Sequence, residues 1–126
     1  MTVEGDQVGD VTSDKRGSGA RYNAGKVEYG LIPLVSLKWA AQVLMFGREK
    51  YAEWNWTKGM KWSVPYNCML RHMDLYQQGE WLDEESGLPH LGHILCNAIM
   101  LNFFAMFYPE GDDRPDPSMF ESRSEE

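Results

Sequence analysis

Histidine and carboxylate side chains are concentrated in one short part of this sequence. All three histidines of the chain, His72, His90 and His93, lie close together, and Glu80 and Asp83 fall between them. Imidazole nitrogen combined with carboxylate oxygen suits Mn²⁺, Fe²⁺ or Zn²⁺, whereas carboxylates alone suit Mg²⁺. The pattern predicts a divalent-metal site. The alternative is that the histidines begin a helix and are satisfied by nearby carboxylates, and spacing alone favours neither.

A second set of acids precedes this cluster. Glu49 and Glu53 are one helical turn apart, and Glu80 and Asp83 form an ExxD pair after a gap. Such carboxylates can hold divalent ions against a polyphosphate. The ions neutralise phosphate oxygens and lower the pKa of a bound water, so that hydroxide attacks phosphorus at neutral pH. For Glu53, a solvated helix end is the better interpretation.

Basic, amide and aromatic side chains form a third set, which suits a nucleotide. Its members are Arg21, Asn23, Lys26, Lys50, Asn55, Trp56 and Arg71. The ammonium of Lys26 could bind a terminal phosphate, and the guanidinium of Arg71 could hold two phosphate oxygens at once. Asn55 could read a base edge. A base could stack on one of the tryptophans within 54–62, although tryptophans more commonly pack in cores.

Helices are the elements that must position these residues. Apolar residues recur at helical spacing after Pro33, between Ser63 and Gly79, and between Pro89 and Pro109. Ser63 is a good N-cap, the prolines suit helix starts, and Gly79 suits a helix stop. No stretch shows the sustained alternation of a strand. The sequence therefore predicts an all-α fold with three helices.

The connection EWLDEESG favours an antiparallel hairpin of the second and third helices. Such a hairpin would bring His72 back towards the start of the third helix. The third helix is apolar nearly all round, and a helix of this kind is normally buried. Because three helices of this size make a thin core, we expect a small helical bundle completed by self-association, as a homo-oligomeric dimer or tetramer.

Length and charge limit the possible functions. At 126 residues the chain is one domain at most, and no apolar run reaches the ~20 residues of a membrane span. The net charge of −7 is concentrated in 1–20 and 109–126, whereas 21–108 is neutral. We expect a domain over 21–108 between a disordered acidic tail and a flexible acidic tail. Neither a nucleic acid nor a membrane is an expected partner, and Cys68 and Cys96 indicate buried free thiols of a cytosolic protein.

Several short motifs also resemble those of a known family. They are GK at 25–26, GxEKY at 47–51, NW at 55–56, RH at 71–72, GExxD at 79–83 and ESGxxHLxH at 85–93. Over roughly residues 21–104 the sequence resembles the phage dATP/dGTP diphosphohydrolase family, which is grouped with the MazG-like all-α nucleotide pyrophosphohydrolases. The resemblance implies hydrolysis of dATP or dGTP to the monophosphate and pyrophosphate with a divalent metal, Mg²⁺ or Mn²⁺, in the cytoplasm of a bacterial host. In phages whose DNA replaces adenine with 2-aminoadenine, such an enzyme removes dATP and supplies dGMP.

The sequence departs from the wider MazG-like group in its metal-binding motifs. That group pairs an ExxE helix with an ExxD helix. Here His90 and His93 occupy the third helix where ExxD would be expected, and ExxD appears as Glu80 to Asp83 ahead of that helix. The assignment of individual metal ligands therefore stays open.

Together, the residues and the resemblance predict a metal-dependent nucleoside triphosphate pyrophosphohydrolase acting on a purine deoxynucleoside triphosphate. The predicted metal ligands are Glu49, Glu53, His72, Glu80, Asp83 and His93, and the predicted catalytic residues are Glu49, Glu80, Asp83 and His90. Lys26, Lys50 and Arg71 would hold the phosphates. One alternative is a His/Asp metal-dependent triphosphohydrolase or phosphatase. Another is a non-enzymatic acidic phage protein that binds a host factor.

Overall fold

A computed structural model of the chain describes residues 19–121, and within them it contains three α-helices, five short 3₁₀ helices and no strand. This confirms the predicted all-α fold. The chain divides into two compact units, Met1–Pro33 and Leu34–Glu126, which we describe separately. The acidic tail predicted over 1–20 falls almost entirely outside the described residues.

In its described part, from residue 19 onward, the first unit contributes one short turn of helix. Its 3₁₀ helix η1 spans Tyr29–Leu31. Gly25 has a φ of +76°, which glycine adopts without strain, and it lies inside a turn closed by a hydrogen bond from the Lys26 N–H to the Asn23 carbonyl at 3.3 Å.

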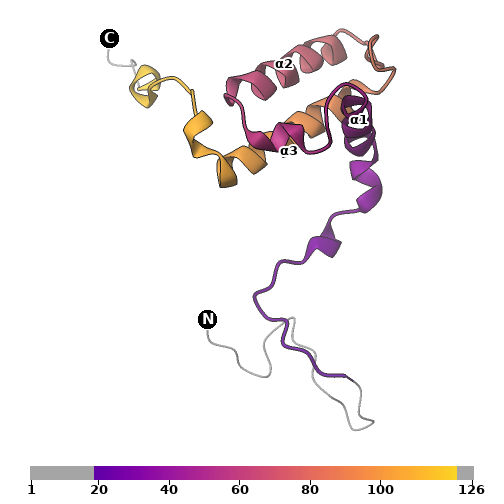
Figure 1. Ribbon diagram of the computed structural model, residues 1–126, viewed down its shortest axis with the longest axis vertical. Coiled ribbons are helices and arrows are strands. Elements are labelled where there is room, and N and C mark those ends of the chain that lie inside the picture. The colour runs from indigo at the N-terminus through magenta and orange to yellow at the C-terminus, as the bar shows by residue number, and fades with distance from the viewer. Residues whose placement is uncertain (1–18, 122–126) are drawn as a thin grey trace. The chain divides into compact units, whose positions relative to one another are not determined.

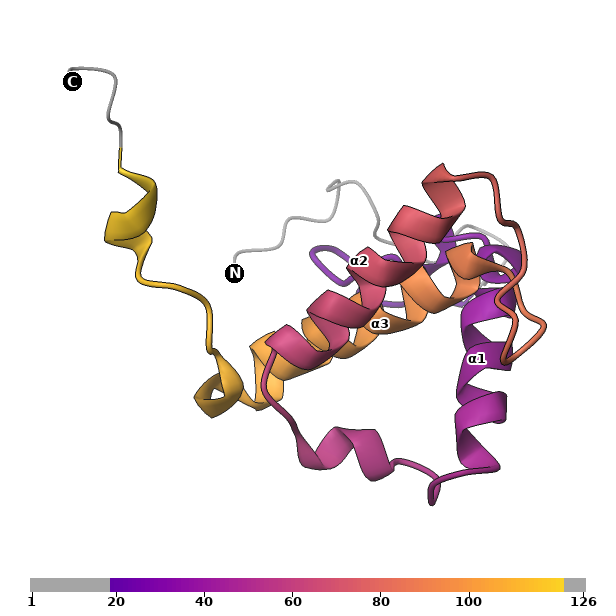
Figure 2. The same cartoon turned by 90° about the horizontal axis from the view of Figure 1, so that it is seen from above.

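The second unit is built around its last long helix. Helix α1 spans Lys38–Arg48, α2 spans Ser63–Gln77 and α3 spans His90–Phe107. Figure 1 and Figure 2 show α2 and α3 side by side, with α1 crossing near the beginning of α3. The α3 helix packs against both of the others, so it is the central helix of this unit.

The helix ends follow the local signals in most places. Helix α2 stops before Gly79, which has a φ of +95°, and α3 begins directly after Pro89. Two predicted starts differ. Leu34–Leu37 forms the tighter 3₁₀ helix η2 before α1, as often happens at helix N-termini. Ser63 is the first residue of α2 rather than its cap, because its N–H and hydroxyl both donate to the Asp113 carboxylate.

Helix α3 is long and apolar enough to meet the length and composition test for a membrane span, although the sequence predicted no such segment. The structure buries 33% of this helix, where it lies against α1 and α2. The buried residues include His90, His93 and Asn97, whose side chains are hydrogen-bonded within the domain.

The α1–α3 crossing depends on a residue without a side chain. A Cβ placed on Gly92 would lie 2.7 Å from Trp39 Cβ and 3.0 Å from the Trp39 carbonyl oxygen. Real Cβ atoms do not approach neighbours so closely, so Gly92 lets α1 lie directly on the first turn of α3.

The chain after α3 makes specific contacts with the beginning of α2. The Trp62 N–H donates to the Gly111 carbonyl at 3.0 Å, and its indole N–H donates to the Tyr108 carbonyl at 3.0 Å. Asp113 holds the first turn of α2, where a carboxylate satisfies free N–H groups. The segment 109–114 is therefore tied to the helices, whereas the sequence predicts a flexible tail from residue 109.

Candidate active site

The three histidines lie together at the end of the α2–α3 hairpin where the connection joins the two helices. His72 lies near the end of α2, and His90 and His93 share one face of the first turn of α3. The rings of His72 and His93 are stacked, with centroids 4.2 Å apart and an interplanar angle of 7°. The antiparallel hairpin predicted from the sequence is confirmed, and it brings His72 back to the start of the third helix.

Glu80, His90 and His72 form a hydrogen-bonded chain. The Nε2 of His90 lies 2.8 Å from Glu80 Oε1, and its Nδ1 lies 2.8 Å from His72 Nδ1. The tautomer of His90 with its hydrogen on Nε2 satisfies both contacts, because it donates to the Glu80 carboxylate and accepts at Nδ1. The proton of His72 is then on Nδ1. This leaves the lone pair of His72 on Nε2, where a metal ion can use it.

Asp83, Ser86 and His93 form a second set of contacts in the turn before α3. Asp83 Oδ2 accepts from the Ser86 N–H at 2.8 Å and from its hydroxyl at 2.9 Å. The Ser86 hydroxyl oxygen lies 2.7 Å from His93 Nε2. Gly87 closes the turn with its N–H on the Asp83 carbonyl at 2.8 Å and a φ of +71°. The ESG motif is thus a turn that fixes Asp83 beside His93.

Burial sets the protonation of this cluster. Burial and the neighbouring His93 lower the pKa of His72 to about 4, and burial also lowers the pKa of His93. For Asp83, burial raises the pKa, but the two hydrogen bonds from Ser86 outweigh it and hold the pKa below its usual range. At pH 7 both imidazoles are therefore neutral and the carboxylate is ionised, which are the forms that bind a metal ion.

His72, Asp83 and His93 fit a divalent cation. Each offers one ligand atom, and these atoms lie within 4.8 Å of one another. His93 Nε2 and Asp83 Oδ2 are 3.7 Å apart, close to the ~3.4 Å between two ligands of a tetrahedral ion with bonds of about 2.1 Å. Because the Ser86 hydroxyl donates to Asp83, His93 Nε2 donates to the Ser86 oxygen, and a cation at this nitrogen would replace that proton. Two imidazoles and one carboxylate suit Mn²⁺, Fe²⁺ or Zn²⁺ better than Mg²⁺. We call these three residues the His/Asp trio.

The acids at the end of the first helix lie elsewhere. Glu49 is the exposed C-cap of α1, and Glu53 lies beyond the helix, where its carboxylate accepts from Arg48 at 3.1 Å. Neither belongs to the His/Asp trio. Their predicted spacing of one helical turn assumed a helix that continues through Glu53, whereas α1 ends at Arg48.

The predicted phosphate-binding residues are divided between the two units. Arg21, Asn23 and Lys26 belong to the first unit, whereas Lys50, Asn55, Trp56 and Arg71 belong to the second. Lys50 forms an ion pair with Glu85 and lies 4.8 Å above the Phe46 ring. Arg71 is exposed on α2, directly before His72.

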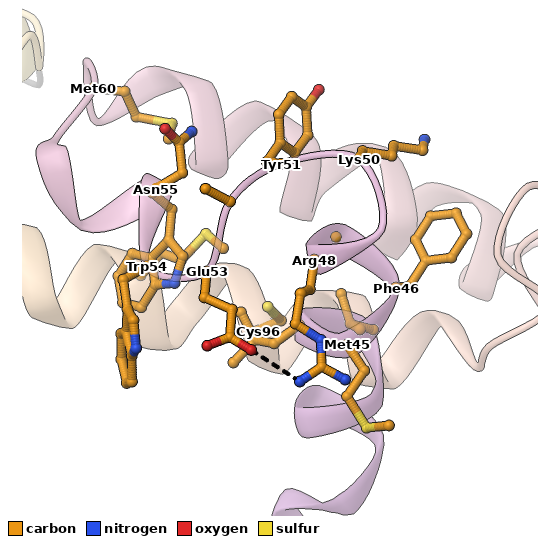
Figure 3. Close-up of a pocket in the computed structure, with 16 residues that line it drawn as sticks. Met45, Phe46, Arg48, Lys50, Tyr51, Glu53, Trp54, Asn55, Met60 and Cys96 are labelled. Carbon is orange, nitrogen blue, oxygen red and sulfur yellow. Dashed lines mark hydrogen bonds and ion pairs between the residues drawn. The ribbon is translucent and has the colours of Figure 1, made fainter.

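A pocket of about 770 Å³ lies between α1, the connection after it and α3. It is lined by residues 43–48, 50–56, Met60, Cys96 and Met100. Figure 3 shows Phe46 and Lys50 on one side of the pocket and Trp54, Asn55 and Met60 on the other. The pocket adjoins the His/Asp trio through α3, because Cys96 follows His93 by three residues on the same face.

The tryptophans of 54–62 differ in their surroundings, and one residue of the site, Ser86, was not among the predicted ones. Trp56 packs its ring against Phe103 and Phe104, at centroid distances of 5.1 and 6.0 Å, and it is half-buried at the edge of the pocket. Trp54 is 71% exposed at the pocket. Ser86 was not predicted, although the Asp83-x-x-Ser86-Gly pattern, typical of an Asx turn, could have indicated it.

Fold and site together define a small all-α protein with a histidine–carboxylate centre suited to a divalent metal. Residues 16–114 match the family described as dATP/dGTP diphosphohydrolase, N-terminal, and the chain belongs to this family. This confirms the resemblance drawn from the motifs. A curated dATP/dGTP diphosphohydrolase of Salmonella phage PMBT28 is 28% identical over 97 residues, which cover 77% of this chain and 33% of the relative. The chain therefore spans about a third of that relative's length. No solved structure matches it.

Proposed function

We propose that this chain carries a catalytic centre that hydrolyses dATP or dGTP to the deoxynucleoside monophosphate and pyrophosphate. The observation that carries the proposal is the His/Asp trio, with two neutral imidazoles and one ionised carboxylate in reach of a single cation. The family description supports the choice of substrate, since it names dATP and dGTP. In a phage that modifies its DNA, the same reaction would remove dATP and supply dGMP.

The trio would hold a divalent cation, with Mn²⁺ favoured over Mg²⁺ by its two nitrogen donors. When bound, such a cation neutralises phosphate oxygens and makes water more acidic. In the reaction, a water oxygen bonds to the α-phosphorus while the bond to the α–β bridging oxygen breaks and pyrophosphate leaves.

The remaining residues around the trio orient its ligands and hold the substrate. Glu80 and His90 fix the ring of His72, and Ser86 fixes both Asp83 and His93. Lys50 lies at the pocket, where its ammonium can exchange Glu85 for a phosphate and oppose charge on the leaving pyrophosphate.

Because a His/Asp trio also suits a phosphatase or triphosphohydrolase, the products decide between these reactions. We would incubate the full chain with each common (deoxy)nucleoside triphosphate and Mn²⁺ or Mg²⁺, and resolve the products by ion-exchange chromatography. Monophosphate and pyrophosphate from dATP or dGTP support the proposal. Tripolyphosphate with nucleoside would select the alternative, and no turnover with either metal would refute both.

The Asp83→Asn variant tests whether the trio is the centre. It removes the only charged ligand of the trio, so we expect kcat to fall by more than about 100-fold. This loss exceeds the ~10- to 100-fold that is usual when a residue hydrogen-bonded to a metal ligand is replaced. Asp74→Asn is the matched control, because Asp74 is exposed on the same hairpin and lies outside the trio. Full activity of Asp83→Asn with an unchanged melting temperature would remove Asp83 from the mechanism.

A further inference from the structure

The pocket beside the His/Asp trio carries almost no unbalanced charge. Arg48 and Glu53 at its edge pair with each other, as Figure 3 shows, and Lys50 pairs with Glu85. Most of the remaining lining is apolar or aromatic. A neutral, flat group therefore fits the pocket better than a phosphate does.

Trp54 is held in an uncommon backbone conformation at this pocket. Its φ is +64°, and it is the only residue other than glycine with a positive φ among residues 19–121. A bulky side chain in the left-handed region is strained, and such strain is typical of functional sites. The turn is secured by Thr57, whose N–H and hydroxyl donate to the Trp54 carbonyl at 3.0 and 2.6 Å. Its result is an indole that is 71% exposed at the pocket.

Asn55 supplies a neutral hydrogen-bonding group next to this indole. Its side-chain amide makes no hydrogen bond within the described part of the chain, and it lines the same pocket. A carboxamide can donate to N7 of a purine and accept from the exocyclic amino group of adenine. Pyrimidines have no N7, so the group offers a basis for discrimination between the two classes of base.

The position of the pocket along α3 gives the direction in which a nucleotide would lie. His93, Cys96 and Met100 recur at i, i+3 and i+7 on one face of α3 and so continue from the trio into the pocket. From His93 to Met100 the rise along the helix is about 10 Å. Phosphates at the trio and Lys50 would thus leave the base within the pocket.

We infer that this pocket is the base-recognition subsite, in which a purine base stacks on Trp54 and is read by Asn55. This inference rests on the proposed function, since it assigns the base of the same substrate. The sequence left the stacking residue open among the tryptophans of 54–62, and the exposure of the indole at the pocket favours Trp54.

The test separates base binding from catalysis by using monophosphates. We would titrate dAMP and dCMP into the full chain in EDTA and follow binding by calorimetry. We expect dAMP to bind at least about 5-fold more tightly than dCMP, because stacking and the N7 contact both favour a purine.

The decisive variant is Trp54→Gly, since glycine removes the indole and relieves the positive φ. We expect dAMP affinity to fall by about 5- to 150-fold, the range for loss of one stacked aromatic, with a melting temperature no lower than that of the parent. Trp81→Ala is the matched control, because Trp81 is 49% exposed and does not line the pocket. Asn55→Leu should reduce the preference for dAMP over dCMP, because the N7 contact is lost while stacking remains, whereas Asn102→Leu at an exposed position of α3 should leave it unchanged.

Retention of dAMP affinity in Trp54→Gly would overturn the inference, and so would an equal loss in Trp81→Ala. Absence of dAMP binding at millimolar concentration would do the same. None of these results bears on pyrophosphate release, which depends on Asp83 and is tested separately by Asp83→Asn.

Discussion

His90 is the most enclosed polar residue of the site, and both of its ring nitrogens are used within the protein. It is fully buried, with Glu80 on one side and His72 on the other. It has no nitrogen left for a cation or a substrate, so in the proposed centre it would position His72 rather than act as the catalytic residue that the sequence predicts. Outer residues of this kind raise the basicity of the ligating imidazole and fix its orientation.

Substitution of Glu80 tests whether His90 positions His72, because Glu80 is the hydrogen-bond partner of His90. We expect Glu80→Ala to lower Mn²⁺ affinity by about 10- to 100-fold, because His90 loses its acceptor and no longer fixes the proton of His72. Glu80→Gln should retain most of the affinity, since its side-chain carbonyl still accepts from His90. Both are measured by calorimetric titration of Mn²⁺.

Glu84→Ala is the matched control for this experiment. Glu84 is an exposed acid of the same turn, so its removal changes the net charge equally without touching His90. If Glu84→Ala lowered Mn²⁺ affinity as much as Glu80→Ala, the effect would be one of overall charge, and the positioning role would be wrong.

The sequence predicts which side chains come together where the residues are close in sequence or lie on one helix. His90 and His93 share a helical face by spacing, and the hairpin brought His72 to them. Glu49 and Glu53 could not be placed, because nothing local to them fixes the end of α1. The exposure of Trp54 rests on a left-handed backbone, which propensity does not predict for tryptophan.

The crossing of α1 over α3 leaves no space for a side chain at Gly92. We expect Gly92→Ala to lower the free energy of unfolding by about 1–3 kcal/mol, since the new methyl group would meet the backbone and Cβ of Trp39. Urea denaturation measures the change.

Gly47→Ala in α1 is the counterpart of this substitution. No atom lies within 4 Å of a Cβ built there, so alanine should raise stability by about 0.5–1 kcal/mol through its better helix propensity. Opposite signs for the two variants are the expected result. Stabilisation by Gly92→Ala would show that the helices are less closely packed at this crossing.

The helices themselves were largely readable from the sequence, because their signals are local. Proline, glycine and helical periodicity marked the stop of α2 and both ends of α3. The residue that caps α2 could not be predicted from local sequence, because Asp113, which accepts from the Ser63 N–H, is fifty residues away. The 3₁₀ turn before α1 likewise has no distinct sequence signal.

The buried histidines should make the stability of the whole molecule depend on pH. The pKa of His72 is about 4 in the folded protein and about 6.5 in an unfolded chain. Between these values the unfolded state binds more protons, so folding stability is full above about pH 6.5 and declines as the pH falls towards 4. His93, whose pKa is also lowered, acts in the same direction.

Urea midpoints at pH 7.5 and pH 5 in EDTA measure this dependence, in a range where most carboxylates stay ionised. We expect a lower midpoint at pH 5, and a smaller difference between the two pH values in His72→Gln. An unchanged difference in that variant would mean that His72 is not the group that titrates.

Self-association stays a prediction. Tyr66, Leu70, Met73 and Tyr76 are exposed apolar side chains at helical spacing along α2. A face of this kind agrees with the expectation that three helices alone make a thin core.

The ring of Tyr108 lies between two glycines that are far apart in sequence. A Cβ on Gly59 would come within 2.6 Å of the ring, and one on Gly111 within 2.7 Å. Gly59 follows the loop that carries Trp54, and Gly111 follows α3, so one ring joins the pocket loop to the segment that holds Asp113 at the start of α2. In evolutionary terms, a smaller residue at 108 alone would not admit a side chain at either glycine, because Gly59 has a φ of +99° and a Cβ at 111 would also lie 2.7 Å from the Met60 carbonyl oxygen.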